Sequence, residues 1–107
     1  MTNESLELIQ NLIHKHKIMV FMKGSRMMPS CGFSNTVVQI LNALNISYET
    51  YDVLQDPEIR QAIKEYSHWP TFPQLYVNGE FLGGADIVLD WYQSGELQTF
   101  LEVALAN

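Results

Sequence analysis

The feature that most constrains the fold is an apolar run followed by a helical pattern and a second strand. Residues 18–22 (IMVFM) are apolar without interruption, which is typical of a strand buried on both faces of an α/β sheet. Apolar side chains recur at helical spacing over residues 31–44, and residues 47–53 are rich in Tyr and Val. A strand–helix–strand unit requires two parallel strands joined by a right-handed crossover.

The rest of the chain adds helices and a hairpin to this unit. Residues 3–16 show the spacing of an amphipathic helix, and a third helix starts at Asp56, where a capping carboxylate precedes a proline. Residues 74–77 and 80–82 flank Asn78-Gly79, the best two-residue signal for a β-hairpin.

Two more helices follow the hairpin, separated by Gly95. The predicted order is therefore α-β-α-β-α-β-β-α-α. We expect an α/β fold in which two parallel strands and the antiparallel hairpin form one four-stranded mixed sheet, with helices on both faces. Ligands bind such sheets beyond the carboxyl ends of the parallel strands.

Length and composition limit the classes of protein to which the chain can belong. Its 107 residues predict a single domain over residues 1–107, without linker or repeat. The net charge of −6 disfavours nucleic acid and anionic membranes as partners, and no apolar run is long enough to span a bilayer. One cysteine excludes an intramolecular disulfide and fits a reducing compartment, so we expect a cytoplasmic protein.

That single cysteine, Cys31, lies where the first strand gives way to the second helix. Unpaired N–H groups at a helix start carry partial positive charge and favour a thiolate, and Lys23 could add a full charge. The alternative is a small buried hydrophobe, which is commoner for lone cysteines. Gly32 and Ser34 are poor core-fillers, and Pro29 begins what resembles an exposed turn, so the sequence favours a reactive thiol.

Four separated motifs carry a resemblance to a known family. They are FMKG at 21–24, CGFS at 31–34, WPTFPQ at 69–74, and Gly-Gly-Ala-Asp at 83–86. In this order, and over essentially the whole chain, they resemble the monothiol glutaredoxins of the CGFS type. The resemblance implies a thioredoxin-like fold, which agrees with the topology predicted above.

The resemblance also implies a glutathione site beside Cys31. Lys23 and Arg60 would hold the glycine carboxylate of glutathione, because charge-assisted hydrogen bonds to a carboxylate favour cations there. The residues by themselves favour another interpretation of the third helix, in which Arg60 and Lys64 are solvated charges near Glu65.

Three further segments complete the implied site. Phe72 would present its backbone N–H and C=O to the cysteinyl part of glutathione, and the family has the following Pro73 in the cis form. Asp86 would pair with the γ-glutamyl ammonium, while the backbone of Ala85 at the helix start would receive the carboxylate. Gly84 permits close approach of a ligand to the backbone.

The presence of a single thiol limits the reactions that the protein can carry out. Ser34 stands where dithiol enzymes carry a resolving cysteine, and a hydroxyl cannot exchange with disulfides. A [2Fe–2S] cluster usually takes four thiolates. Cys31 from two chains and two glutathione thiolates complete that set, and the family implies the same arrangement. We therefore predict a cluster-bridged homodimer that receives and hands over a [2Fe–2S] cluster, with BolA-like proteins and acceptor proteins as the partners that the resemblance implies.

Two alternatives remain open from the sequence. One is a glutathione-dependent oxidoreductase that removes glutathione from protein thiols with the same Cys31, although residues 25–29 lengthen the loop as in the carrier class. The other is an interaction module in which Cys31 is incidental, which leaves the spacing of the motifs unexplained. Met27 and Met28 are equally compatible with exposure and with a partly buried packing pair.

Overall fold

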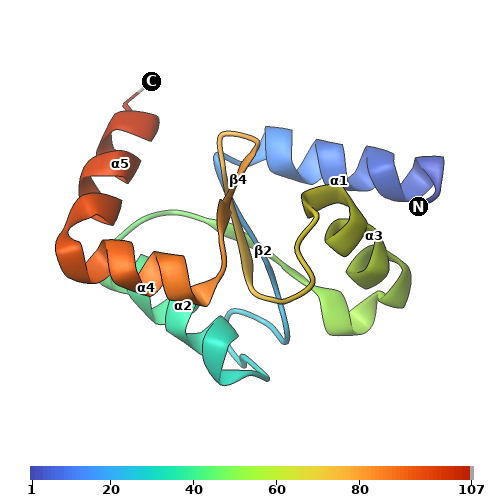
Figure 1. Cartoon of the computed structure of the whole chain (residues 1–107), viewed down its shortest axis with the longest axis horizontal. Helices are drawn as coiled ribbons and strands as arrows, with labels where there is room; N and C mark the ends of the chain where they lie inside the picture. The colour runs from blue at the N-terminus through green and yellow to red at the C-terminus, as the bar shows by residue number, and fades with distance from the viewer. Residues whose placement is uncertain (107) are drawn as a thin grey trace.

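A four-stranded sheet separates two layers of helices in the computed structural model, which describes residues 1–106 (Figure 1). The strands are β1 (Ile18–Met22), β2 (Glu49–Asp52), β3 (Gln74–Val77) and β4 (Glu80–Gly83), in the spatial order β2-β1-β3-β4. Strand β1 pairs parallel with β2 and antiparallel with β3, and β3 pairs antiparallel with β4. The predicted thioredoxin-like mixed sheet is therefore confirmed.

The helices divide between the two faces of this sheet. Their bounds are α1 (Asn3–Lys15), α2 (Gly32–Ala43), the short 3-10 helix η1 (Val53–Gln55), α3 (Pro57–Ser67), α4 (Ala85–Ser94) and α5 (Glu96–Ala104). Helices α1 and α3 lie on one side, and α2 and α4 on the other, with α5 continuing from α4 (Figure 1). Among residues 1–106, no helix is both long and apolar enough to cross a membrane.

Strand β1 joins the two halves of the core. All of its side chains are buried, as its unbroken apolar sequence predicts. Successive side chains of a strand point to opposite faces. Ile18, Val20 and Met22 therefore pack with α2, α4 and α5, whereas Met19 and Phe21 pack with α1 and α3. The carboxyl end of this central strand is consequently fixed from both sides, and the loop that leads to Cys31 starts there.

Strand β2 is shorter than the predicted 47–53. It ends at Asp52, whose carboxylate accepts a hydrogen bond from the N–H of Leu54 at 2.9 Å and starts the 3-10 turn η1. A side chain that bonds the backbone two residues on competes with continued strand pairing. The same Asp52 oxygen also accepts the N–H of Gly24 at 2.9 Å, so the end of β2 holds the start of the loop after β1.

Candidate functional site

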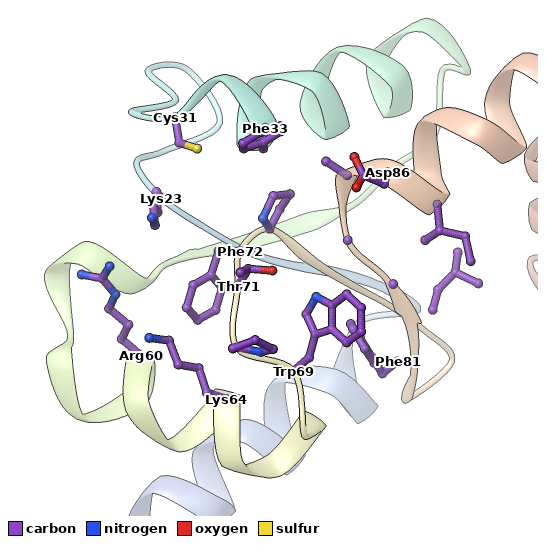
Figure 2. Close-up of a pocket in the computed structure, with 17 residues that line it drawn as sticks. Lys23, Cys31, Phe33, Arg60, Lys64, Trp69, Thr71, Phe72, Phe81 and Asp86 are labelled. Carbon is purple, nitrogen blue, oxygen red and sulfur yellow. The ribbon is translucent and has the colours of Figure 1, made fainter.

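A cavity of about 740 Å³ opens beyond the carboxyl end of β1, between the starts of α2 and α4, the side of α3 and the loop before β3 (Figure 2). This is where an open α/β sheet is expected to bind ligands. Every residue of the predicted site lines the cavity: Lys23, Cys31, Arg60, Phe72, Pro73, Gly84, Ala85 and Asp86.

Cys31 occupies the N-cap position of α2 and is partly exposed, so it is not a buried core residue. Its side chain makes no capping hydrogen bond, which leaves the first N–H groups of the helix directed at the thiol. The N–H of Ser34 is the main cause that lowers the pKa of the Cys31 thiol, and the N–H of Phe33 and the charge of Lys23 act in the same direction. Partial desolvation opposes them without reversing the shift.

From the sequence, Ser34 is expected to be a poor core-filler. In the structure, however, Ser34 is fully buried. Its hydroxyl oxygen accepts a hydrogen bond from the backbone N–H of Lys23 at 3.1 Å, so the buried polar group is satisfied. This bond joins the end of β1 to the first turn of α2. Ser34 therefore fixes the relative positions of Lys23 and Cys31, a role that the sequence did not reveal.

The loop between Lys23 and Cys31 folds into a tight hairpin. The N–H of Ser25 donates to the carbonyl of Met28 at 3.2 Å, and the N–H of Met28 donates back to the carbonyl of Ser25 at 3.1 Å. Gly24 adopts φ +86°, and a Cβ there would lie 2.5 Å from the Met28 carbonyl oxygen, so only glycine fits. At the tip, Met27 and Met28 are 87% and 77% exposed. Of the two possibilities left open by the sequence, exposure and a partly buried packing pair, the structure therefore shows exposure.

Cations occupy the side of the cavity below the thiol. Lys23 extends from the end of β1, and Arg60 and Lys64 rise from successive turns of α3 (Figure 2). Among residues 1–106, neither α3 cation lies within ion-pair distance of a carboxylate, and Glu65 pairs instead with the amino group of Met1 at 3.5 Å. Both cations border the cavity, a position that suits solvated side chains as well as binding of a ligand carboxylate.

The opposite side of the cavity is built from the start of α4 and the loop before β3. Gly84 is the N-cap of α4 and leaves that helix start without a side-chain cap, while Asp86 lies in its first turn. A Cβ on Gly84 would lie 3.3 Å from the carbonyl oxygen of Pro73 and 3.6 Å from Nε1 of Trp69, so this backbone segment is already in close contact. The Phe72–Pro73 peptide bond is cis, as the resemblance implied.

The cavity also contains residues that the sequence analysis did not assign to it. Lys64 lies one turn after Arg60, so its place on the same helix face was predictable. Phe33 and Trp69 belong to the motifs quoted above. Phe81 carries no signal of its own: strand pairing brings it into the cavity wall, where its ring lies 6.0 Å from that of Trp69 (Figure 2).

Comparisons with known proteins agree with this geometry. The family model described as glutaredoxin matches residues 18–82. An uncharacterized monothiol glutaredoxin of Synechocystis is 64% identical over 107 residues and is covered completely, as is this chain. A probable monothiol glutaredoxin of Rickettsia typhi is 53% identical, with 95% of this chain and 92% of that protein covered.

A solved structure has the same fold at substantial sequence identity. The solution structure of reduced apo GrxS14 from poplar superimposes with a TM-score of 0.84 at 49% identity, covering 95% of this chain and 94% of that one. With one cysteine in the chain and these relatives, the protein belongs to the glutaredoxin family and, within it, to the monothiol glutaredoxins.

Proposed function

We propose that the cavity binds glutathione with its sulfur beside Cys31, and that the protein uses this arrangement to carry a [2Fe–2S] cluster. Membership of the monothiol glutaredoxins supports a glutathione-dependent redox role. The observation that carries the proposal is the juxtaposition, in one cavity, of a lone activated thiol with charged groups at two opposite sides.

The charges of the cavity fit those of glutathione, which has a carboxylate at each end and an ammonium at one. Lys23, Arg60 and Lys64 would hold the glycine carboxylate by charge-assisted hydrogen bonds. The uncapped start of α4 would receive the other carboxylate, and Asp86 in its first turn would pair with the ammonium. Opposite charges at the two ends of the ligand thus define one orientation.

The middle of the cavity suits the peptide part of the ligand. Phe72 would offer its backbone N–H and C=O to the cysteinyl residue, as one strand does to another, next to the cis Pro73. The backbone of Ala85 lies beside this segment at the start of α4, where Gly84 packs closely against the carbonyl oxygen of Pro73. A peptide held in this way presents its sulfur next to Cys31 at the rim.

The single thiolate that one chain can offer also fits a cluster shared between two chains. Cys31 is partly exposed, and the helix start and Lys23 favour its thiolate, the form that ligates iron. Two chains and two bound glutathiones would supply four thiolates. We therefore propose a cluster-bridged homodimer that passes its cargo to acceptor proteins, with BolA-like proteins as further partners that the family resemblance supports.

Anaerobic reconstitution with and without glutathione tests this function. With glutathione, we expect a coloured protein with the absorption of a [2Fe–2S] cluster and the mass of a dimer. Without glutathione, or in Cys31→Ser, we expect a colourless monomer, because half of the thiolate ligands are missing. A wild type that stays colourless and monomeric in the presence of glutathione would contradict the carrier function.

A second function uses the same thiol and is favoured by its lowered pKa. As an oxidoreductase, Cys31 would attack the glutathione sulfur of a mixed disulfide, and the other thiol would leave as a thiolate. A second glutathione would then release the first from Cys31 as oxidised glutathione. Steady-state turnover of a protein–glutathione mixed disulfide measures this activity: brisk turnover by a protein that takes up no cluster would make the oxidoreductase the better description.

A further inference from the structure

Exposed apolar side chains are concentrated around the thiol. Met27, Met28 and Phe33 are 87%, 77% and 63% exposed, and among the other large apolar residues in positions 1–106 only Val103, at 70%, is more than 60% exposed. All three lie within four residues of Cys31 in the sequence. Single exposed apolar residues are ordinary, but a group of them rimmed by polar residues marks an interaction surface.

The fold presents Met27 and Met28 on a rigid support, the thiol-side hairpin of residues 24–30, and presents Phe33 on the first turn of α2. The reciprocal hydrogen bonds of Ser25 and Met28 close the turn of the hairpin. Next to the tip, the guanidinium of Arg26 donates to the carbonyl of Tyr48 and lies 4.3 Å from the centre of its ring. The tip is therefore ordered before any partner arrives, which reduces the entropy lost on binding.

Cations outnumber carboxylates around the hairpin and its cavity, where Glu49, Asp52 and Asp86 also lie, although the chain as a whole is acidic. The protein has 12 acidic and 6 basic Lys or Arg residues, a net charge of 6 − 12 = −6. Four of the six basic residues lie on the hairpin or in the adjoining cavity: Lys23, Arg26, Arg60 and Lys64. One of them, Arg26, also has Glu49 at 3.5 Å. A partner that meets the exposed methionines therefore also meets cations.

We propose that the thiol-side hairpin and Phe33 dock a partner protein that presents an apolar patch bordered by Asp and Glu side chains. The proposal rests on the proposed function, since it concerns the protein with which Cys31 exchanges sulfur or cluster. The cavity takes a ligand of tripeptide size, and the hairpin takes the macromolecule. Like charges around the hairpin oppose direct pairing with a second copy of this chain, and in the proposed homodimer the cluster rather than the hairpin joins the two copies.

Binding of two synthetic peptides tests the surface without any thiol chemistry. Both have a Leu-Phe centre and no cysteine, and one is flanked by glutamates and the other by lysines. We expect the Glu-flanked peptide to shift the amide resonances of residues 25–33. Its affinity should fall about fivefold or more in Met27→Gln/Met28→Gln, the change that loss of a modest apolar contact produces. The matched control is Val103→Gln, an equally exposed site on α5, which should bind as the wild type does.

Thiol exchange tests whether the surface serves the reaction. Cys31 thiolate attacks the glutathione sulfur of a glutathionylated, Glu-flanked peptide, the S–S bond breaks, and the peptide leaves as a thiolate. In Met27→Gln/Met28→Gln this exchange should slow about fivefold or more, whereas exchange with oxidised glutathione should stay within about twofold of the wild type. Mass spectrometry of quenched samples gives both rates.

Each other outcome contradicts the proposal. Equal slowing with both disulfides means that the hairpin acts on the thiol itself, and unchanged peptide binding means that the hairpin is not the docking surface. Preference for the Lys-flanked peptide overturns the acidic partner. Weaker self-association of Met27→Gln/Met28→Gln in sedimentation, with unchanged peptide binding, assigns the surface to a second copy. If the wild type reacts with neither disulfide, the glutathione function fails, while the cysteine-free peptides still decide the docking.

Discussion

Helices α3 and α2 start in opposite ways. At α3, the carboxylate of Asp56 accepts the N–H of Ile59 at 3.1 Å, and the hydroxyl of Tyr51 donates to the other carboxylate oxygen at 2.7 Å. At α2, Cys31 holds the same N-cap position and makes no capping bond, and at α4 the cap is Gly84, which has no side chain. The first N–H groups of α3 are thus bonded to a carboxylate, whereas those of α2 face only the thiol sulfur and those of α4 have no side-chain cap at the cavity.

The difference follows from what each helix contributes to the site. Helix α3 contributes side chains, Arg60 and Lys64, from later turns, so its start can be capped for stability. Helices α2 and α4 contribute their backbone N–H groups, which a side-chain cap would occupy. The uncapped starts of α2 and α4 both lie at the cavity, where the proposed function uses their N–H groups for a thiolate and an anion, whereas the equally uncapped start of α5 at Gly95 lies outside the cavity.

The largest effect is expected at the capped start. Asp56→Ala should reduce the free energy of unfolding by about 1–2 kcal/mol, because it removes the cap of α3 and the acceptor of the Tyr51 hydroxyl. Urea denaturation measures the loss. Cys31→Ala is the matched control at an uncapped start and should change stability by less than about 0.5 kcal/mol. Equal losses in both variants would remove the contrast between the two helices.

A smaller effect is expected on the ligand. Lys23→Ala and Arg60→Ala should each weaken glutathione binding by about 1 kcal/mol, because a charge-assisted hydrogen bond is lost at a site that solvent partly screens. Calorimetry with oxidised glutathione measures the affinities. Lys15→Ala removes an exposed cation from α1, outside this cavity, and should bind as the wild type does. Unchanged binding in both cavity variants would leave the open helix starts as the main anion site.

Closing the open start of α2 should stabilise the protein. Cys31→Ser places a preferred capping residue where the thiol makes no capping bond, and we expect a gain of about 0.5–1 kcal/mol in the free energy of unfolding. The same variant should lose all thiol exchange. Gly84→Ser should show no comparable gain, because its Cβ would crowd the carbonyl oxygen of Pro73. A loss of stability in Cys31→Ser would mean that the thiol itself supports the helix.

The smallest effect concerns the pKa of Cys31. Iodoacetamide alkylates the thiolate, so the alkylation rate increases with pH as the thiol loses its proton. Because the pKa of Cys31 is lowered, we expect the midpoint of this increase to lie below the value of about 8.5 for free cysteine. Ser34→Ala should move this increase to higher pH, because the Ser34 hydroxyl also bonds the thiol and lowers its pKa. The shift is small because the Ser34 N–H, the main cause of the lowering, survives the substitution. Thr36→Ala, which removes a hydroxyl bonded to the Gly32 carbonyl one turn away, should leave the profile unchanged.

Local signals in the sequence predicted much of the fold. The apolar run gives the bounds of β1, and Asn78-Gly79 adopts the positive φ angles of 50° and 81° that the predicted hairpin turn requires. The Asp56 cap and the helix break at Gly95, with φ 85°, also match. In each case a few neighbouring residues determine the conformation, so no knowledge of the tertiary structure was needed.

Features that depend on distant segments were not predictable in the same way. The early end of β2 depends on the carboxylate of Asp52. This carboxylate accepts hydrogen bonds from the N–H of Leu54, two residues on, and from the N–H of Gly24, which follows the neighbouring strand β1. The burial of Ser34 depends on the N–H of Lys23, and the place of Phe81 in the cavity depends on strand pairing. Sequence motifs identified residues that line the cavity, but only the packed structure shows what holds them there.

Strand β1 is buried on both faces of the sheet, and this affects how the protein unfolds. Since alternate side chains of this strand belong to the cores on the two faces of the sheet, neither core can come apart while the strand stays in place. Exchange of the β1 amide hydrogens with solvent should therefore require global unfolding, whereas amides in the hairpin of residues 24–30 should exchange through local fluctuations. The thiol is thus attached, through a hairpin closed by its own hydrogen bonds, to the part of the molecule that is expected to open last.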